Sequence, residues 1–255
     1  MDWDSWVAPV QQLALEAGAV ILGERARGLT VTVKPDGSPQ CNADCAADAF
    51  IMLGLQNLDP LIPVITEESA PSVMPSLDKP FWLVDPLDGT RSFLAGHDDY
   101  SINIALIIQQ RPAFGLIYAP SRQEMFWNDG DGAAWYSSPA SAPAARLAAR
   151  PVPQQGMTMI TGRRTMTGLR LQGWLDNNSV AQHLMVSSAL KFGYIAQGKA
   201  DVYPRFGETM EWDNAAGEAI LVAAGGGVAT LDGYPLPYGQ ADLMHRGFIA
   251  YGRKS

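Results

Sequence analysis

The sequence predicts an α+β fold, in which helices and an antiparallel sheet come from different stretches of the chain. Apolar residues recur at helical spacing in the first 60 residues, whereas short apolar runs separated by turn signals follow in the middle of the chain. Beyond residue 153, strand-like and helix-like segments alternate. The chain has 255 residues, of which 47% are hydrophobic and 17% charged, so it can bury a sizeable core.

Two helices are expected in the N-terminal part. Apolar residues between Trp6 and Ile21 fall on one helical face, and Pro9 fits such a helix only in its first turn. A second helix is expected over residues 44–58. Its apolar side chains share one face: Ala47, Phe50, Ile51, Leu55 and Leu58.

Strands are expected next. Residues 64–65 and 81–84 are short apolar runs bounded by proline and acidic turns, which is typical of buried strands. Residues 100–109, 113–118 and 124–127 follow with short links, which predicts an antiparallel meander.

The second half is expected to be mixed α/β. Residues 137–153 are rich in Ala, Pro and Ser and interrupt the pattern, so we divide the chain into an N-terminal half, 1–143, and a C-terminal half, 144–255. In the later half, strand-like and helix-like segments alternate. The strand-like segments are 157–161, 181–187 and 247–251, and the helix-like segments are 189–197 and 214–224.

The composition excludes several classes of protein. With 18 basic and 26 acidic residues the net charge is −8, so no nucleic acid polymer is expected as a partner. A small phosphorylated ligand is compatible with this charge, because metal ions reverse the local sign of a site. The acidic N-terminus does not resemble a secretory signal, and the longest apolar stretch, around residues 219–229, is too short to span a bilayer. We therefore expect a cytoplasmic protein without a membrane span.

Two familiar kinds of site are not supported. Residues 193–200, Gly-Tyr-Ile-Ala-Gln-Gly-Lys-Ala, nearly match a phosphate loop, but Ala200 lacks the required hydroxyl and Gly198 is placed to end a helix. The three histidines (His97, His183 and His245) are widely spaced, so neither a zinc site nor a histidine-centred triad is expected.

The most informative stretch is residues 81–90, Phe-Trp-Leu-Val-Asp-Pro-Leu-Asp-Gly-Thr. Pro86 restricts the backbone so that the strand ends on Asp85 in a defined direction, and Asp88 follows three residues later. Gly89 allows a ligand to approach the backbone, and the N–H groups of Gly89 and Thr90 can hold an anion if a helix begins there. Taken alone, the same residues also fit a solvated turn.

Acidic residues elsewhere favour the functional interpretation. Glu67 and Glu68 follow a predicted strand, and Asp213 stands where the N-cap of an Ala-rich helix would be. The two glutamates also fit a solvated edge, and Asp213 a purely structural cap. Together, Glu67, Asp85, Asp88 and Asp213 make an all-oxygen ligand set of the kind that Mg²⁺ prefers.

With these motifs the sequence resembles the inositol monophosphatase superfamily of Mg²⁺-dependent, lithium-sensitive phosphatases. The motifs are Asp-Pro-Leu-Asp-Gly-Thr at 85–90, Trp-Asp-Asn-Ala-Ala-Gly at 212–217, and the Glu67-Glu68 pair. Within the superfamily, residues 100–106, 187–192 and 200–207 are most similar to CysQ-type 3′(2′),5′-bisphosphate nucleotidases. The resemblance implies a layered α/β sandwich, with paired helices on an antiparallel sheet followed by a smaller mixed sheet.

The resemblance also implies an activity and a metal site. The expected reaction converts adenosine 3′,5′-bisphosphate, and also its 5′-phosphosulfate form, to a nucleotide and phosphate by in-line attack of water. Glu67, Asp85 and the Leu87 carbonyl would hold one Mg²⁺, and Asp85, Asp88 and Asp213 a second. Glu67 would also touch a third, looser ion.

The same resemblance assigns catalytic and substrate-binding roles. Thr90, paired with Asp44 or Glu67, would deprotonate the attacking water. Lys191 and Arg205 would hold a second phosphate, although a solvated helix face for Lys191 and a structural ion pair for Arg205 are alternatives. The full set of expected substrate contacts is Glu67, Leu87, Asp88, Gly89, Thr90, Ser187, Ser188, Lys191, Arg205 and Asp213.

Some positions depart from the family pattern. Cys41 replaces a threonine, Arg91 and Ser92 replace a lysine and an acidic residue, and Ser187 replaces a glycine. Cys41 and Cys45 fit a reducing compartment and are either a redox-sensitive pair or small buried residues.

Other functions and states of assembly stay open. An inositol-phosphate or other sugar-phosphate phosphatase is the main alternative function, and a non-catalytic regulatory binding protein is a weaker one. Both monomers and homodimers fit, and peripheral association with the inner membrane is implied by the resemblance alone.

Overall fold

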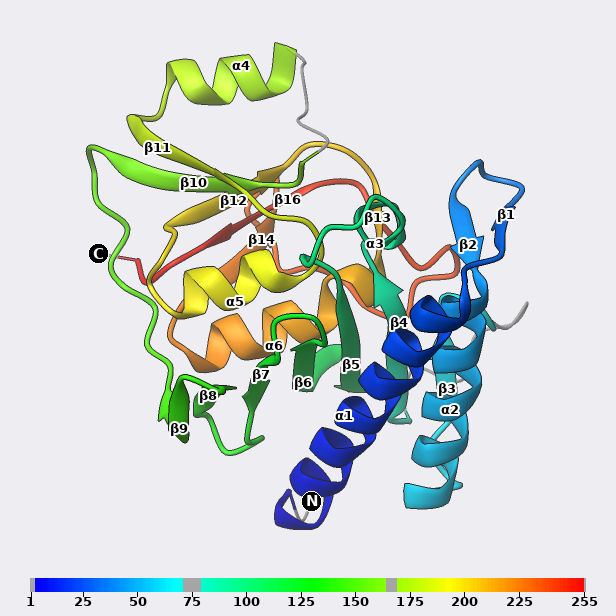
Figure 1. The fold of residues 1–255 in the computed structure, drawn as a ribbon. Helices are drawn as coiled ribbons and strands as arrows, with labels where there is room; N and C mark the ends of the chain where they lie inside the picture. The colour runs from blue at the N-terminus through cyan, green and yellow to red at the C-terminus, as the bar shows by residue number, and fades with distance from the viewer. Residues whose placement is uncertain (1–2, 71–78, 164–168, 255) are drawn as a thin grey trace.

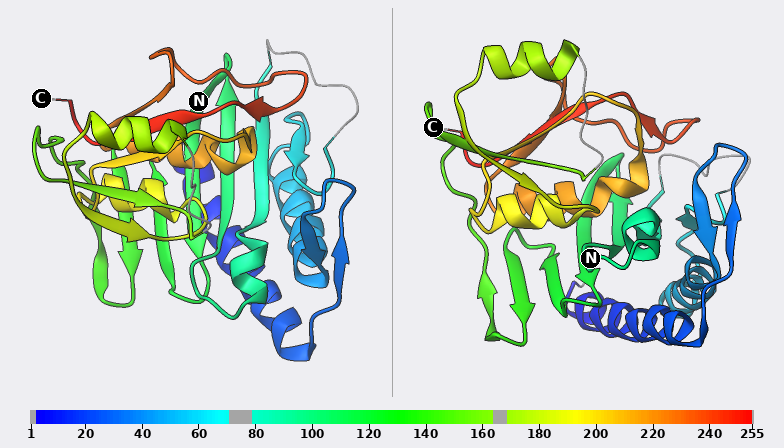
Figure 2. Two further views of the ribbon diagram at one scale, coloured as in Figure 1. Left: turned by 90° about the horizontal axis from the view of Figure 1, so that it is seen from above. Right: turned by 45° about the horizontal axis from the view of Figure 1, so that its top comes forward.

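The computed structural model describes residues 3–70, 79–163 and 169–254 (Figure 1). The first two residues of the acidic N-terminal sequence lie outside the described part. Five layers follow one another (Figure 2). They are helices α1 (Asp4–Arg27) and α2 (Asn42–Leu58), a seven-stranded sheet, helices α5 (Leu190–Ala196) and α6 (Ala215–Ala223), a five-stranded sheet, and helix α4 (Leu169–Asp176). The predicted α+β class and layered α/β sandwich are confirmed.

The larger sheet is built mainly from consecutive strands. Its spatial order is β3-β4-β5-β6-β7-β8-β9, with β3 parallel to β4 and every later pair antiparallel. The predicted meander is therefore confirmed. The strands are β3 Val64–Thr66, β4 Phe81–Asp88, β5 Ser101–Ile108, β6 Arg111–Ala119, β7 Glu124–Asn128, β8 Ala134–Ser138 and β9 Ser141–Arg146.

The segment 137–153 differs from the prediction, because it does not interrupt the sheet. Strand β9 lies inside it and pairs with β8, so the division at residue 143/144 falls within a strand. Pro143 is tolerated there because β9 is the edge of the sheet, where one side of the backbone needs no partner.

Helices α1 (Asp4–Arg27) and α2 (Asn42–Leu58) cover one face of this sheet (Figure 1). Pro9 lies in the second turn of α1, one turn later than the sequence predicted. The turn before it is held by aromatic packing: the Trp3 ring lies 6.5 Å from Phe114, and the Trp6 ring 5.7 Å from Trp82. Burial of these indoles offsets the cost of the proline.

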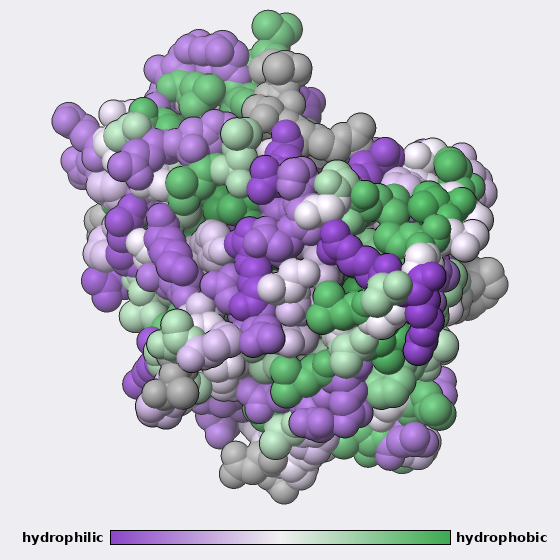
Figure 3. All heavy atoms as spheres, in the orientation of Figure 1, coloured by the Kyte–Doolittle hydropathy of each residue, from purple (hydrophilic) through white to green (hydrophobic). Residues whose placement is uncertain are grey.

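A short hairpin that we did not predict connects the two helices. Its strands are β1 (Val31–Val33) and β2 (Pro39–Cys41), paired antiparallel. Val31 and Val33 are 49% and 72% exposed, and the hairpin carries a hydrophobic patch at the right of Figure 3. Residues 29–34, Leu-Thr-Val-Thr-Val-Lys, alternate apolar and polar side chains, so the sequence does carry a strand signal here that the prediction overlooked.

The smaller sheet has the order β11-β10-β12-β16-β14 and is mixed, as expected. A two-stranded sheet, β13-β15, stands beside it. Gly198, at φ +70°, follows the end of α5, which agrees with rejecting a phosphate loop there. The elements are β10 Met157–Thr161, α4 Leu169–Asp176, β11 Val180–Met185, α5 Leu190–Ala196, β12 Val202–Arg205, β13 Thr209–Met210, α6 Ala215–Ala223, β14 Gly227–Thr230, β15 Met244–His245 and β16 Phe248–Tyr251.

One helix in the described part of the chain, Ser5–Arg27, is long and apolar enough to cross a membrane by length and composition alone. The prediction of no such segment overlooked it. The apolar face of this helix faces the core, where Val10, Ala14, Ala17 and Ile21 are completely buried against α2 and the sheet. Because only 28% of its apolar window is buried, α1 packs as an amphipathic helix that lies on the sheet.

Candidate functional site

Three carboxylates from two distant parts of the chain converge at the end of β4. Asp85 and Asp88 belong to β4, and Asp213 closes a 3₁₀ turn, η1 (Glu211–Asp213). One oxygen from each carboxylate lies within 4.8 Å of the others. The pairing of β4 with β5 shifts between Asp85 and Asp88, where Pro86 interrupts the ladder, so both acids reach the same side.

Burial makes this group of acids unfavourable when all are ionised. The pKa of Asp85 is raised well above its usual value by burial and by the charges of Glu67, Asp88 and Asp213. Burial, with the charge of Asp213, raises the pKa of Asp88 to about 6. A bound cation would relieve both effects, and carboxylate oxygens suit a hard divalent ion.

Glu67 lies beside the three carboxylates but is held by a lysine. Lys34, on the β1–β2 hairpin, places its Nζ 2.7 Å from Glu67 Oε1 and 2.9 Å from Glu68 Oε1. Burial raises the pKa of Glu67 to about 7, against the opposing effect of Lys34. Sequence reasoning missed Lys34, since a single lysine in an exposed hairpin carries no motif.

Thr90 pairs with Asp44 rather than with Glu67. The Thr90 hydroxyl lies 2.9 Å from Asp44 Oδ1 and 3.1 Å from the Leu87 carbonyl oxygen. The other Asp44 oxygen, Oδ2, accepts hydrogen bonds from the Cys41 backbone N–H (2.9 Å) and from its thiol (2.8 Å). Gly89, at φ +90°, begins the short helix α3 (Thr90–Leu94).

The two cysteines have different surroundings. Cys41 is buried and Cys45 is exposed, and both are free thiols. Burial and the neighbouring Asp44 raise the pKa of Cys41 to about 12, so the thiol keeps its proton and donates a hydrogen bond to Asp44.

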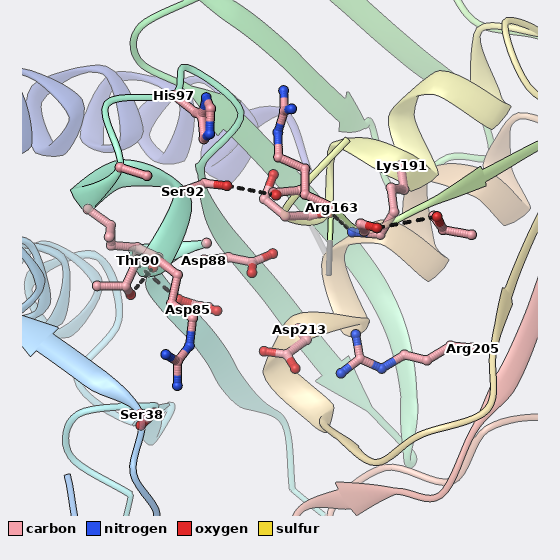
Figure 4. Close-up of a pocket in the computed structure, with 18 of the residues that line it drawn as sticks. Ser38, Asp85, Asp88, Thr90, Ser92, His97, Arg163, Lys191, Arg205 and Asp213 are labelled. Carbon is pink, nitrogen blue, oxygen red and sulfur yellow. Dashed lines mark hydrogen bonds between the residues drawn. The ribbon is translucent and has the colours of Figure 1, made fainter. Parts of the chain in front are cut away.

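A pocket of about 680 Å³ opens beside the carboxylates and is lined from both halves of the chain (Figure 4). The expected residues Glu67, Asp85, Leu87, Asp88, Gly89, Thr90, Ser187, Ser188, Lys191, Arg205 and Asp213 all line it. Asp44 lies behind Thr90, outside the lining. Sequence reasoning did not include Ser38, His97 or Arg163, which line the pocket as well.

Lys191 and Arg205 border a small recess of this pocket that Asp88 and Asp213 also line. Lys191 is only 5% exposed, which excludes a solvated helix face, and its ammonium contacts the Ser188 carbonyl oxygen. Arg205 donates to the Tyr203 hydroxyl (3.3 Å) and the Glu208 carbonyl (2.8 Å), with no ion pair to an acid among the described residues. Both cations therefore lie next to the carboxylates.

The sequence predicted Asp213 as the N-cap of α6, and this prediction is wrong. The N-cap is the next residue, Asn214. Asp213 instead closes the preceding turn, where its Oδ2 accepts the Met210 N–H at 3.1 Å and contacts the Thr209 hydroxyl. Behind it, the buried His245 bonds Asn214 through Nδ1 (3.0 Å) and the Pro237 carbonyl through Nε2 (2.7 Å). These bonds fix the backbone that presents Asp213.

Comparison with known proteins agrees with this site. The model of the inositol monophosphatase family matches residues 2–254. The 3′(2′),5′-bisphosphate nucleotidase CysQ of Escherichia coli O157:H7 is 38% identical over 234 residues, 90% of this chain and 92% of the relative. The protein of the same name from Buchnera aphidicola is 34% identical over 254 residues, 97% of this chain and 94% of the relative.

Solved structures show the same fold. CysQ from Bacteroides thetaiotaomicron, a bacterial member of the inositol monophosphatase family, is similar with a TM-score of 0.81 and 28% identity, covering 97% of each chain. The chain belongs to the inositol monophosphatase family. The relationship inferred from the motifs is confirmed, and with it the class of phosphatase.

Proposed function

We propose that this protein is a Mg²⁺-dependent phosphomonoesterase that hydrolyses adenosine 3′,5′-bisphosphate to AMP and phosphate. It also accepts the 5′-phosphosulfate form of this nucleotide. The observation that carries the proposal is the convergence of Asp85, Asp88 and Asp213 beside the Thr90–Asp44 pair in one pocket. The CysQ nucleotidases, 34% and 38% identical over most of the chain, support the choice of substrate.

The residues present fit a divalent metal centre. Their oxygen donors and the raised pKa values of Asp85 and Asp88 indicate a site short of positive charge. Glu67, Asp85 and the Leu87 carbonyl would hold one Mg²⁺, and Asp85, Asp88 and Asp213 another, with a third ion at Glu67. Bound Mg²⁺ lowers the pKa of water and neutralises charge on the leaving oxygen.

The chain's own groups orient the reaction. Thr90 donates its hydroxyl proton to Asp44 Oδ1, which leaves a Thr90 lone pair free to accept the proton of the attacking water. Asp44, fixed on its other oxygen by Cys41, thereby acts as the base through Thr90. The backbone N–H groups of Gly89 and Thr90 bind the scissile phosphate. Water attacks phosphorus in line while its proton passes through Thr90 to Asp44, the bond to the 3′ oxygen breaks, and that oxygen takes up a proton from a second water molecule of the solvent.

Substrate selection falls to the second half of the chain. Lys191 and Arg205 hold the phosphate of the substrate that is not hydrolysed, and Ser187 and Ser188 contact its ribose or phosphate. We place the substrate between the halves 1–143 and 144–255, because their residues line the pocket together. The enzyme acts in the cytoplasm.

The deciding experiment measures phosphate release with Mg²⁺ from adenosine 3′,5′-bisphosphate and from inositol 1-phosphate under the same conditions. We expect kcat/KM to favour the nucleotide by at least about 100-fold, and Asp213→Asn to reduce kcat by about 10³-fold or more. A preference for inositol 1-phosphate would contradict the proposed substrate but not the proposed metal ligands. Full activity of Asp213→Asn would overturn the metal site.

A further inference from the structure

The two oxygens of the Asp213 carboxylate lie in different surroundings. Oδ2 accepts the Met210 backbone N–H at 3.1 Å and the hydroxyl of Thr209. Within residues 3–70, 79–163 and 169–254, no donor bonds the other oxygen, Oδ1. Asp213 lines the pocket, and Figure 4 shows it between Arg205 and the aspartates of β4. Oδ1 is therefore the oxygen that the chain leaves available to a ligand.

The Thr209 hydroxyl is the donor in its contact with Asp213. An ionised carboxylate only accepts hydrogen bonds, so the proton lies on the threonine oxygen and points at Oδ2. Thr209 is 5% exposed, so water cannot replace the hydroxyl freely if it is lost. Because threonine is branched at Cβ, few rotamers are open to it, and the direction of the hydroxyl follows from the backbone.

The backbone at Thr209 is held by the elements around it. Thr209 belongs to β13 and is paired with His245 of β15. The carboxylate of Glu211, in the turn η1, accepts the backbone N–H groups of Gly239 at 2.6 Å and Gln240 at 2.9 Å. Glu211 is completely buried, so these bonds fasten the chain before β15 to the turn. Strand β13 and η1 therefore hold the Thr209 hydroxyl at a fixed place.

The other two carboxylates of the site are also held by donors. Asp85 Oδ1 accepts the Leu87 N–H at 3.0 Å, and Asp88 Oδ2 accepts the Asn103 amide at 3.1 Å. Asp85 and Asp88 share strand β4, whereas Asp213 comes from a different element and needs a support of its own. A hydrogen bond to one oxygen of a metal-binding carboxylate fixes the direction of the other, and loss of such a partner lowers metal affinity or activity about 10- to 100-fold.

We propose that Thr209 is a positioning residue for Asp213 and that its hydroxyl sets the affinity of the site for a divalent cation. The bond to Oδ2 keeps the carboxylate from rotating, so Oδ1 stays directed to the space that Asp213 shares with Asp85 and Asp88. This assignment rests on the metal ligands of the proposed function and adds a residue that does not itself bind the ion.

The test compares two variants of this threonine. Thr209→Val keeps the shape of the side chain but removes the hydroxyl, whereas Thr209→Ser keeps the hydroxyl and removes the methyl group. Isothermal titration calorimetry of the metal-free protein with MgCl₂, in the absence of substrate, gives the Kd for Mg²⁺. We expect Thr209→Val to raise this Kd about 10- to 100-fold and Thr209→Ser to keep it near that of the unmodified protein. At saturating Mg²⁺ the KM for the substrate should not change in either variant, because Thr209 does not line the pocket.

Thr158→Val is the matched control. Thr158 is a threonine of β10 that is 6% exposed, and its hydroxyl bonds Arg150 at 3.3 Å, away from the pocket. Its replacement should leave the Kd for Mg²⁺ unchanged. Thermal unfolding in EDTA verifies that each variant is folded. If Thr209→Val does not fold, Thr209→Ala is compared with Thr209→Ser, since these two differ in the hydroxyl alone.

Two results would overturn the proposal. An unchanged Kd in Thr209→Val would show that the hydroxyl does not hold Asp213 in its binding direction. An equal rise of the Kd in Thr209→Val and Thr209→Ser would show that the site responds to any change of packing at this position.

Failure of the proposed function would be visible separately, because the titration contains no substrate. If the unmodified enzyme prefers inositol 1-phosphate, the proposed substrate is contradicted, and the difference in Kd between the two Thr209 variants would still support the role of the hydroxyl. Failure of the unmodified protein to bind Mg²⁺ would contradict both the metal centre and the role of Thr209.

Discussion

The two oxygens of the Asp44 carboxylate have different roles: one is bound by Cys41 and the other contacts Thr90. Oδ2 accepts both bonds from Cys41, at the start of α2, and Oδ1 faces the Thr90 hydroxyl. Asp44 is 2% exposed, so water cannot replace a lost partner freely. The direction in which Oδ1 points therefore depends on the residue at position 41.

Replacing Cys41 tests this dependence. We expect Cys41→Ala to lower kcat about 3- to 10-fold with KM unchanged, because Asp44 keeps the backbone N–H but loses the thiol, a weak donor. Cys41→Thr should retain or raise kcat, since a hydroxyl replaces the thiol at an N-cap. Steady-state kinetics on the preferred substrate measures both effects.

The control for this experiment is Cys45→Ala, which removes the exposed thiol one turn along the same helix. It should match the unmodified enzyme. Equal kcat in Cys41→Ala and the unmodified enzyme would show that the thiol does not position Asp44.

At the scale of elements, the site depends on how closely α6 packs against the larger sheet. A Cβ atom added at Gly115 on β6 would lie 2.4 Å from the Ala216 carbonyl oxygen and 2.8 Å from its Cα. These are backbone atoms of the first turn of α6, just after Asp213. The missing side chain of Gly115 thus permits the approach that brings Asp213 to the end of β4.

Gly115→Ala is expected to push α6 away from the sheet. Overpacking of this kind costs about 1–3 kcal/mol of unfolding free energy. The shift of Asp213 should also raise the Mg²⁺ concentration needed for half-maximal activity. Urea unfolding and Mg²⁺ titration of the activity measure the two effects.

Gly23→Ala serves as the matched control. Gly23 lies in α1 with nothing within 4 Å of an added Cβ, so alanine should stabilise the helix by about 0.5–1 kcal/mol without changing the Mg²⁺ requirement. An unchanged Mg²⁺ requirement in Gly115→Ala would show that the geometry of the metal site does not depend on how closely α6 packs at Gly115.

The same packing explains which elements the sequence could predict. Helix α2 and strands β5 and β6 bury regular apolar patterns, and each was predicted within two residues. Residues 29–34 alternate apolar and polar side chains, so β1 was predictable and was overlooked. Strand β9, by contrast, has no such alternation and is held by pairing at a sheet edge. The start of α1 depends on where Trp3 and Trp6 pack, which is information about tertiary structure.

The site residues likewise divide into those that a local sequence pattern predicts and those that only the fold brings together. Asp85, Asp88 and Asp213 occur in local motifs that a reader can recognise in the sequence. Lys34 and Arg163 meet their carboxylate partners across 33 and 64 residues of chain, and no local pattern encodes either contact. Their positions come from the fold alone.

For the molecule as a whole, buried acids make stability depend on pH and metal together. The pKa values of Glu67 and Asp88 are raised to about 7 and about 6, mainly by burial, and burial also raises the pKa of Asp85 well above its usual value. Away from the site, burial also raises the pKa of Glu218 to about 7. Burial lowers the pKa of His245, which acts in the opposite direction below about pH 6.5.

The sign of the effect follows from proton binding. Between about pH 4 and pH 7 the folded, metal-free protein holds more protons on these carboxyls than the unfolded chain does, so its stability falls as the pH rises. Divalent ions bind the ionised carboxylates of the folded state, so their stabilising effect grows over the same range. The difference in stability between the metal-free and the metal-bound protein isolates the metal-binding acids from Glu218, whose pKa is shifted by burial away from the site and which contributes equally to both.

We therefore expect the gain in Tm on replacing EDTA by saturating Mg²⁺ to increase steadily from pH 5 to pH 8. A pKa shift of about two units corresponds to about 3 kcal/mol, so Asp88 alone gives a measurable change. Asp88→Asn should raise the Tm in EDTA at pH 8, because it removes one repelling charge, and should shrink the gain from Mg²⁺. Glu218→Gln, which lies outside the pocket, should leave that gain unchanged. A gain that is constant with pH would mean that the three carboxylates do not bind the ion together, whereas a gain that rises with pH in the unmodified protein and flattens in Asp88→Asn would tie the acidity of this site directly to its metal.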